Sequence, residues 1–295
     1  MNAIYRQLKY RFTECGLIFL IATLLFLPLT TSQVLADNKA TKQTHYHFGV
    51  VPQFGQRKLF SIWMPILQML EAETGLKFKL VGSEQISAFE DKFSAGEFDF
   101  SYMNPYHAVL ANRVQQYMPI IRDGARKLQA IIVVKNDSPI RSVNELMGKE
   151  VAFPSANALA SLLSRAELLR KHGVKIKPRY VKTHSSVYIH VAQGLISAGG
   201  GVESTLKQQK PEITKLLRVL YRTHTQNPHP IVAHPRVPDN HVKQVQAALI
   251  AMSQRKDGQK LLSKVPMLKA TIATLDDYNP ISMLRLNELD DSEVQ

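Results

Sequence analysis

Alternation between strand-like and helix-like segments is the feature that most constrains the fold of this chain. Short apolar segments typical of β-strands are separated by longer segments with an apolar face at helical spacing. In order they are strands at 45–51, 78–81 and 98–103, helices at 59–75 and 85–95, and a helix that starts at Pro105. Strands joined by crossover helices run parallel, so this order predicts an α/β fold with a mostly parallel sheet.

The same alternation returns in the second half of the chain. Strands are expected at 128–135, 150–154, 178–183 and 218–223, and helices at 142–148, 158–173, 185–195 and 202–217. The last part of the chain is helical in pattern, over 240–254, 257–265 and 275–289. This length and organisation suit one large domain or two smaller ones.

The N-terminus has the pattern of an export signal. Basic residues at 6, 9 and 11 precede an apolar run from Gly16 to Pro28. Polar residues at 30–33 and the segment Val34-Leu35-Ala36 follow, with the small residue of a cleavage signal at Ala36. The run is shorter than the roughly 20 residues that a membrane-spanning helix needs. We therefore expect a signal peptide at 1–36, cleavage after Ala36, and a periplasmic chain of 259 residues. Cys15 is the only cysteine of the sequence, so that chain can form no disulfide.

Charge and motifs exclude several classes of function. The sequence has 37 basic and 24 acidic residues, a net charge of +13, and the chain after residue 36 keeps about +11. The basic residues are dispersed and not interleaved with aromatic ones, which argues against nucleic-acid binding, whereas a positive field attracts small anions. No catalytic motif occurs and no cofactor is expected. The histidines are scattered, apart from His45 and His47, so no metal site is expected.

The glycine run at 199–201 is not a dinucleotide-binding motif. It lacks the required glycine spacing and follows a predicted helix rather than a strand. We expect it to permit close backbone approach or a positive φ angle.

Polar residues gather at three points where a predicted strand gives way to a helix. They are Tyr102 and Asn104 in "SYMNPY", Ser155 and Asn157 in "FPSANALAS", and His184 and Ser185 in "KTHSSVY". In open α/β sheets ligands bind at the carboxyl ends of strands, and helix N-termini attract anions. These residues predict an anion site; the alternative is that they are ordinary helix caps and core-edge aromatics.

Several segments together resemble the phosphate, phosphite and phosphonate type of periplasmic substrate-binding protein of ATP-binding-cassette transporters. They are "FGVVPQF", "WMPILQMLEAETG", "AGEFDFSYMNP", "IIVVKNDSPIRSVNELMGKEVAF", "THSSVYIHVAQG" and "HPIVAHPRVP". The resemblance runs from about residue 46 to about 245. It implies a type II fold with two α/β lobes joined by two hinge crossovers. Lobe one would comprise 44–128 and 231–295, and lobe two 129–230.

The resemblance also implies roles for individual residues. Such proteins hold the anion with a tyrosine at the end of the third strand, matched by Tyr102, and with a histidine, matched by His184. They also use a hydroxyl-rich loop, but here Ser155 is followed by Ala156, Asn157 and Ala158, which removes most hydroxyl donors.

The sequence also differs from those family members that bind aminoalkyl phosphonates, at the residues that would contact the organic substituent. Of the two acids that hold the amine in members that bind them, Glu203 lies near one position and His229 replaces the other. Ile86 stands where some members carry a second tyrosine. A smaller or differently charged ligand is therefore expected.

The expected function is that of a monomeric periplasmic protein, not an enzyme, which captures a small oxyanion and delivers it to a membrane permease. The alternative is a sensor of the same fold that signals to a membrane sensor kinase. Both would use the same cleft, so the residues do not separate them.

Overall fold

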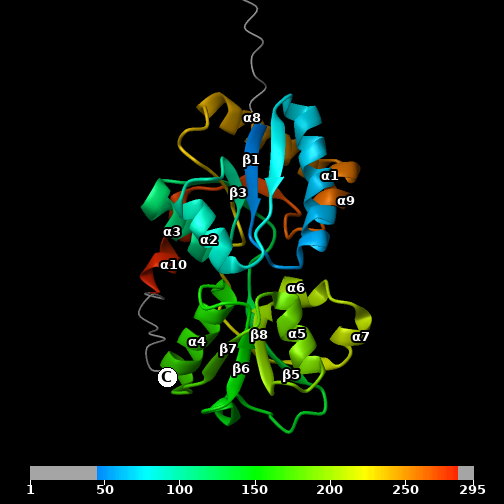
Figure 1. Cartoon of the computed structure of the whole chain (residues 1–295), viewed down its shortest axis with the longest axis vertical. Helices are drawn as coiled ribbons and strands as arrows, with labels where there is room; N and C mark the ends of the chain where they lie inside the picture. Colours follow the sequence, from blue (N-terminus) through cyan, green and yellow to red (C-terminus); the bar gives the residue numbers. More distant parts are fainter. Residues whose placement is uncertain (1–44, 285–295) are drawn as a thin grey trace, which may run out of the picture. The chain divides into compact units, whose positions relative to one another are not determined.

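A computed structural model describes residues 45–284, which lie in one compact unit spanning Gln43–Gln295. The predicted signal peptide at 1–36 lies outside the described residues. Two β-sheets, each with helices around it, make up the described chain (Figure 1). We call the half built on the six-stranded sheet lobe 1 and the half built on the five-stranded sheet lobe 2.

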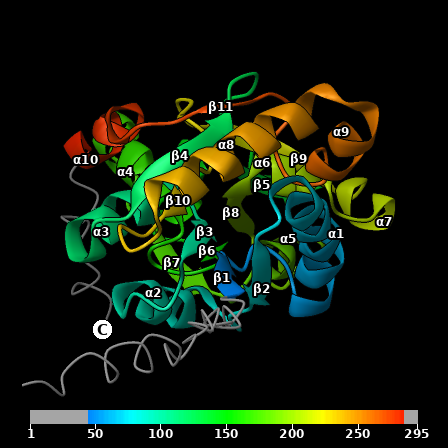
Figure 2. The ribbon, with the colours of Figure 1, turned by 90° about the horizontal axis from the view of Figure 1, so that it is seen from above.

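The sheet of lobe 1 has the strand order β11-β4-β10-β3-β1-β2. Its strands are β1 (His45–Val50), β2 (Lys77–Val81), β3 (Phe100–Tyr102), β4 (Met118–Asp123), β10 (Ile231–Ala233) and β11 (Ala270–Ile272). The helical elements of this half are α1 (Gln56–Thr74), α2 (Ile86–Ser94), α3 (Pro105–Gln115), α8 (Asp239–Gln254), α9 (Lys256–Leu262), the 3-10 turn η2 (Leu275–Tyr278) and α10 (Asn279–Met283). In both views α1 and α9 lie on one side and α2 and α3 on the other (Figures 1 and 2).

The sheet of lobe 2 has the order β7-β6-β8-β5-β9. Its strands are β5 (Ala130–Lys135), β6 (Glu150–Phe153), β7 (Lys177–Tyr180), β8 (Ala198–Val202) and β9 (Leu217–Arg222). The helical elements are the 3-10 turn η1 (Val143–Leu146), α4 (Leu159–His172), α5 (His184–Ala192), α6 (Glu203–Lys207) and α7 (Pro211–Thr214). The predicted helix at 202–217 is thus two short helices preceded by the end of a strand.

The α/β architecture with two sheets agrees with the prediction, but both sheets are mixed rather than mostly parallel. In lobe 1, β1 pairs in parallel with β2 and β3, whereas β10 is antiparallel to β3 and β4, and β11 is antiparallel to β4. In lobe 2, β5 is antiparallel to both of its neighbours. The strands that enter from the other lobe, β5 and β10, are each antiparallel to both of their neighbours.

Two segments connect the lobes, one between β4 and β5 and one between β9 and β10. They pair with each other, because the backbone N–H groups of Leu128 and Gln226 each donate to the other residue's carbonyl oxygen at 2.8 Å. The predicted lobe boundaries, at 128/129 and 230/231, fall in these segments. The division into lobes at these residues stays our proposal.

The glycines of 199–201 form the middle of β8, inside the sheet of lobe 2. None of them has a positive φ angle, so that part of the expectation is wrong. Close approach accounts for all three. A Cβ atom on Gly200 would overlap the ring of Phe153, and one on Gly201 would overlap the phenol of Tyr188.

Apolar packing continues from one lobe to the other. Tyr106 and Val109 of α3 belong to the same buried cluster as Leu159 and Leu163 of α4, with Tyr278 from the C-terminal segment. The lobes therefore meet through an apolar contact, and the N-terminus of α4 is held against lobe 1. Within residues 45–284, no helix combines the length and the apolar character needed to cross a membrane.

Candidate ligand-binding site

A closed cavity lies where the lobes meet. Its volume is about 10 Å³, close to the space of one water molecule. Lobe 1 contributes residues that follow strands β1, β2 and β3, and lobe 2 contributes residues that follow β6 and β7 together with the last residue of β8. The walls are formed by Val51, Pro52, Gln53, Ile86, Asn104, Ala158, Leu159, Ala160, His184, Val202 and His229. Strand ends from both sheets thus converge at one point, as the sequence predicts.

The N-terminus of α4 is the main source of backbone donors at this cavity. The first N–H groups of a helix have no partner within the helix, and they lie at its positive end. Ala158 is the N-cap, and no described side chain caps the helix there. Ala158, Leu159 and Ala160 all line the cavity, and the small side chains of the two alanines leave its backbone open to a ligand.

His184 supplies an unpartnered ring nitrogen beside that helix, which is a donor in the tautomer that carries its proton on Nδ1. It is the first residue of α5, its side chain is 5% exposed, and it lines the cavity. Its Nδ1 atom is buried and has no hydrogen-bond partner among residues 45–284. Burial lowers the pKa of His184 to about 4, so the imidazole is neutral at neutral pH. A buried polar atom without a partner is costly unless a ligand pairs with it.

His229 forms the opposite wall, and its position is fixed from two sides. The side-chain amide of Gln53 is 3.1 Å from its Nε2 atom, and Tyr102 stacks on its ring with centroids 5.2 Å apart. Burial is the main cause that lowers the pKa of His229 to about 3, and the nearby imidazoles of His184 and His107 contribute to the same shift. The site therefore contains neutral imidazoles rather than fixed positive charges.

Tyr102 and Asn104, the two lobe 1 candidates from the sequence, have different positions. Asn104 lines the cavity and caps α3, because its Oδ1 atom accepts the N–H of His107 at 2.8 Å. Its amide nitrogen is the group that it can offer to a ligand. Tyr102 is not part of the cavity wall. It is 1% exposed between Trp63 and His229, so it supports a wall residue from behind.

The loop before α4 does not place its polar side chains in the cavity wall. Ser155 is turned toward the chain itself, and its Oγ atom accepts the N–H of Ala158 at 3.1 Å. Asn157 reaches the other lobe, where its Nδ2 atom lies 3.3 Å from Oε2 of Glu90 on α2. The other carboxylate oxygen of Glu90 lies 2.8 Å from Nε2 of the buried His107. Asn157 is thus part of the contact between lobes.

Ser185 and Glu203 lie outside the wall of the closed cavity. Glu203 begins α6 and pairs with Lys207 at 3.2 Å and with Arg222 at 3.5 Å. The structure therefore brings together Asn104, His184 and His229.

Gln53 is the cavity residue that sequence reasoning missed. It follows β1 in a segment with no other polar side chain, so only its position after a strand could have indicated it.

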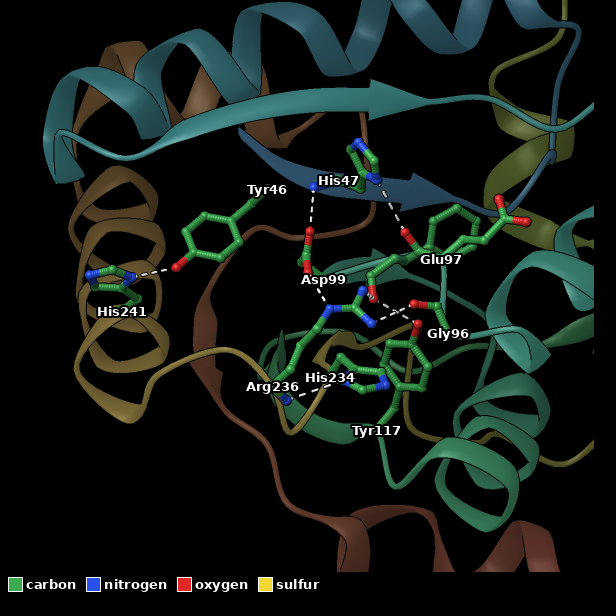
Figure 3. Close-up of polar contacts among 10 residues, drawn as sticks. Tyr46, His47, Gly96, Glu97, Asp99, Tyr117, His234, Arg236 and His241 are labelled. Carbon is green, nitrogen blue, oxygen red and sulfur yellow. Dashed lines mark hydrogen bonds and ion pairs between the residues drawn. The ribbon is translucent and has the colours of Figure 1, made fainter. Parts of the chain in front are cut away.

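Three of the remaining histidines, His47, His234 and His241, have structural contacts in lobe 1 (Figure 3). Arg236 donates to Asp99 at 2.6 Å, to the carbonyl of Gly96 at 2.6 Å and to that of Phe98 at 2.7 Å. Asp99 also accepts the backbone N–H of His47 at 2.7 Å. This network ties the segment after β10 to β1 and β3. Within the described residues, no group of three or more His, Cys, Asp or Glu side chains could hold a metal ion.

Comparisons with known proteins point to one family. A family described as "ABC transporter, phosphonate, periplasmic substrate-binding protein" matches residues 48–278. The chain is 26% identical to the phosphate-import protein PhnD of Mycolicibacterium smegmatis over 165 residues, which are 54% of this chain. It spans about half the length of that curated relative, 50%.

Solved structures share the fold. The binding-protein component of an ABC phosphonate transporter from Pseudomonas aeruginosa has a TM-score of 0.76 at 17% identity, covering 82% of this chain and 85% of that one. PhnD1 from Prochlorococcus marinus in complex with methylphosphonate also has a TM-score of 0.76 at 17% identity, covering 83% and 98%. These likenesses confirm the type II periplasmic binding-protein fold.

Proposed function

Because this chain belongs to the family of periplasmic substrate-binding proteins of phosphonate ABC transporters, we propose that it captures a small phosphorus oxoanion between its lobes and delivers it to a membrane permease. The family is one of transport proteins of the periplasm rather than of enzymes. The observation that supports the proposal is that two sets of hydrogen-bond donors lie at one place. The unpartnered Nδ1 atom of His184 and the uncapped N-terminus of α4 border the same cavity.

The donors suit an anion with several oxygen atoms. Backbone N–H groups of α4 point along the helix axis toward its N-terminal end, and their aligned dipoles favour negative charge there. His184 and the amides of Gln53 and Asn104 add donors from other directions. Oxygens of a phosphonate or phosphate group accept hydrogen bonds from several directions at once. The lost hydroxyls of the loop are thus offset in part by groups that do not depend on Ser155 or Asn157.

Capture requires the lobes to separate and close again. A cavity of about 10 Å³ does not hold a phosphorus oxoanion, so the lobes must move apart for the ligand to enter and must then close around it with a wider space than this arrangement leaves. Several polar contacts among the described residues cross between the lobes, including one from Arg170 of α4, which donates to the carbonyl of Leu284 at 2.7 Å. Asn157 approaches Glu90, and the Nζ atom of Lys58 donates to the carbonyl of Gln208 at 2.9 Å. We assign these contacts to the stabilisation of the closed form.

Export is part of the same proposal. Residues 1–36 would direct the chain across the inner membrane and be removed after Ala36, and the protein would act as a monomer with a permease as its partner. Signalling to a sensor kinase would use the same cavity, and no contact among the described residues favours it over transport.

A ligand panel tests the function directly. Purified protein lacking residues 1–36 is titrated with phosphate, phosphite, methylphosphonate and sulfate, and unfolding is followed with heat. A ligand at a hundredfold excess over its Kd raises the free energy of unfolding by about 2.7 kcal/mol. We expect at least one phosphorus oxoanion to stabilise the protein and sulfate to do so less. Equal stabilisation by sulfate, or none by any phosphorus compound, would contradict the proposal.

A further inference from the structure

A second and larger cavity adjoins the closed one. Its volume is about 400 Å³, and it shares two wall residues, Val202 and His229, with the closed cavity. It lies against the two segments that connect the lobes and against the start of α6. A ligand whose phosphorus group occupies the first cavity would therefore extend its substituent past His229 into this second space.

Positive charge dominates the second cavity. Arg126, Lys127 and Lys207 line it, and Glu203 is its only carboxylate. These basic side chains belong to exposed residues, so they are hydrated and remain able to turn toward a ligand. The amide of Gln129 and the hydroxyl of Ser204 add uncharged polar groups to the same wall.

Glu203 is already neutralised by its neighbours. Lys207 lies 3.2 Å from Oε1 of its carboxylate and Arg222 lies 3.5 Å from the same oxygen. An ammonium group that entered the cavity would have to displace one of these cations while the others repel it. A carboxylate in the same place would be attracted by Arg126, Lys127 and Lys207, and it would compete with Glu203 only for Lys207.

We propose that the ligand carries a second negatively charged group, a carboxylate on the organic substituent of its phosphorus, and that this group lies in the second cavity against Arg126, Lys127 and Lys207. The chemical class is that of the phosphonocarboxylates. This inference rests on the proposed function, because it assumes that the phosphorus group lies at His184 and α4. It specifies the organic substituent of the ligand, because the basic residues of the second cavity repel an amine at that position.

Calorimetric titration with four phosphonates tests the inference. Methylphosphonate has no charged substituent, 2-aminoethylphosphonate carries an amine, and phosphonoacetate and 3-phosphonopropionate carry a carboxylate at two different reaches. At low ionic strength we expect one of the carboxylates to bind at least tenfold more tightly than methylphosphonate, and 2-aminoethylphosphonate to bind more weakly than methylphosphonate. Salt should reduce the carboxylate advantage, because the cations are exposed and salt screens their charge.

Matched variants locate the effect. Lys207→Gln and Arg126→Gln should each reduce the carboxylate advantage several-fold. Lys207→Gln should also improve binding of the amine, because it removes one of the two cations that neutralise Glu203. Lys210→Gln is the control, since Lys210 is exposed three residues further along but does not line the cavity. An equal loss of the carboxylate advantage in Lys210→Gln would show that the effect comes from the general positive charge of the surface. That result would contradict the placement of the carboxylate in the second cavity.

The outcomes separate the two proposals. If methylphosphonate binds and neither carboxylate binds more tightly, or if the amine binds best, the inference is wrong while the proposed function stands. If none of the four phosphonates binds, and phosphate and phosphite also fail, the proposed function is wrong and the inference falls with it.

Discussion

The imidazole of His229 is stacked on the phenol ring of Tyr102, with ring centroids 5.2 Å apart and an angle of 19° between the planes. Tyr102 in turn contacts Trp63, with centroids 4.9 Å apart. Three rings thus connect the core of lobe 1 with the wall of the cavity. Tyr102, predicted from the sequence as a ligand contact, has a position that suits holding His229 in place.

Variants of Tyr102 should therefore separate ring packing from hydroxyl chemistry. Tyr102→Phe keeps the stacked ring and should change ligand affinity by less than threefold, whereas Tyr102→Leu removes it. Loss of a buried aromatic ring typically costs about 3–5 kcal/mol when the replacement is alanine, and leucine should cost less. We expect Tyr102→Leu to lower both stability and affinity, measured by denaturant unfolding and calorimetry. A tenfold loss of affinity in Tyr102→Phe would show instead that the hydroxyl contacts the ligand.

His184 should be the side chain on which binding depends most. Its unpartnered Nδ1 atom has no role in holding the fold, so replacement should affect the ligand more than the protein. We expect His184→Gln to weaken binding of the phosphorus oxoanion at least tenfold, equivalent to about 1.4 kcal/mol. His190→Gln, on the same helix but outside the cavity, is the matched control. Unchanged affinity in His184→Gln would remove His184 from the site.

Stability should depend on pH through the two buried imidazoles. Burial lowers the pKa of His184 from its ordinary 6.5 to about 4 and that of His229 to about 3, so the unfolded chain binds more protons than the folded one below pH 6.5. Above that pH both imidazoles are neutral in the folded and the unfolded state, so they do not make stability depend on pH. As pH falls from about 6.5 toward 4, the unfolded chain gains protons that the folded chain does not, and the protein should lose stability. The loss is about 1 kcal/mol per pH unit for each imidazole.

The contribution of His184 to this pH dependence can be isolated. Urea unfolding of the ligand-free protein at several pH values between 4.5 and 7.5 should show a shallower slope in His184→Gln than in the unaltered protein, and no such change in His190→Gln. An identical slope in all three proteins would mean that His184 does not stay neutral in the folded state.

Asn157 should act on closure rather than on contact with the ligand. Its amide approaches Glu90 across the lobes at 3.3 Å, and both residues lie outside the closed cavity. Asn157→Ala should weaken ligand binding by the value of one hydrogen bond, about 0.5–1.5 kcal/mol, through a smaller population of the closed form. Small-angle scattering of the ligand-free protein should show a larger radius of gyration in this variant. Asn144→Ala, an exposed asparagine of η1, should change neither quantity.

Sequence patterns were sufficient to predict those strands and helices in which apolar side chains recur at a regular spacing. Much of the order of strands and helices followed from apolar periodicity, but β4 and β8 did not. Pro119 lies inside β4, and three consecutive glycines, as in β8, are untypical of a strand. The three-residue strands β10 and β11 are too short to show a period. At the site, His184 was indicated by its place at a strand end. The donors of α4 belong to the backbone, and no residue type marks them.

Gly200 provides the most direct test of the fold at β8. A Cβ atom there would overlap the ring of Phe153, which is fully buried in the core of lobe 2, so the ring or the strand would have to move. We expect Gly200→Ala to lower the free energy of unfolding by about 1–3 kcal/mol, the usual cost of overpacking a core. Gly55→Ala is the control, because a Cβ atom on Gly55 would meet nothing within 4 Å and its φ angle of −59° suits alanine. Because Val202, which ends β8, borders both cavities, a shift of this strand should also reduce ligand affinity. If Gly200→Ala is as stable as Gly55→Ala, β8 does not pack against Phe153 as described.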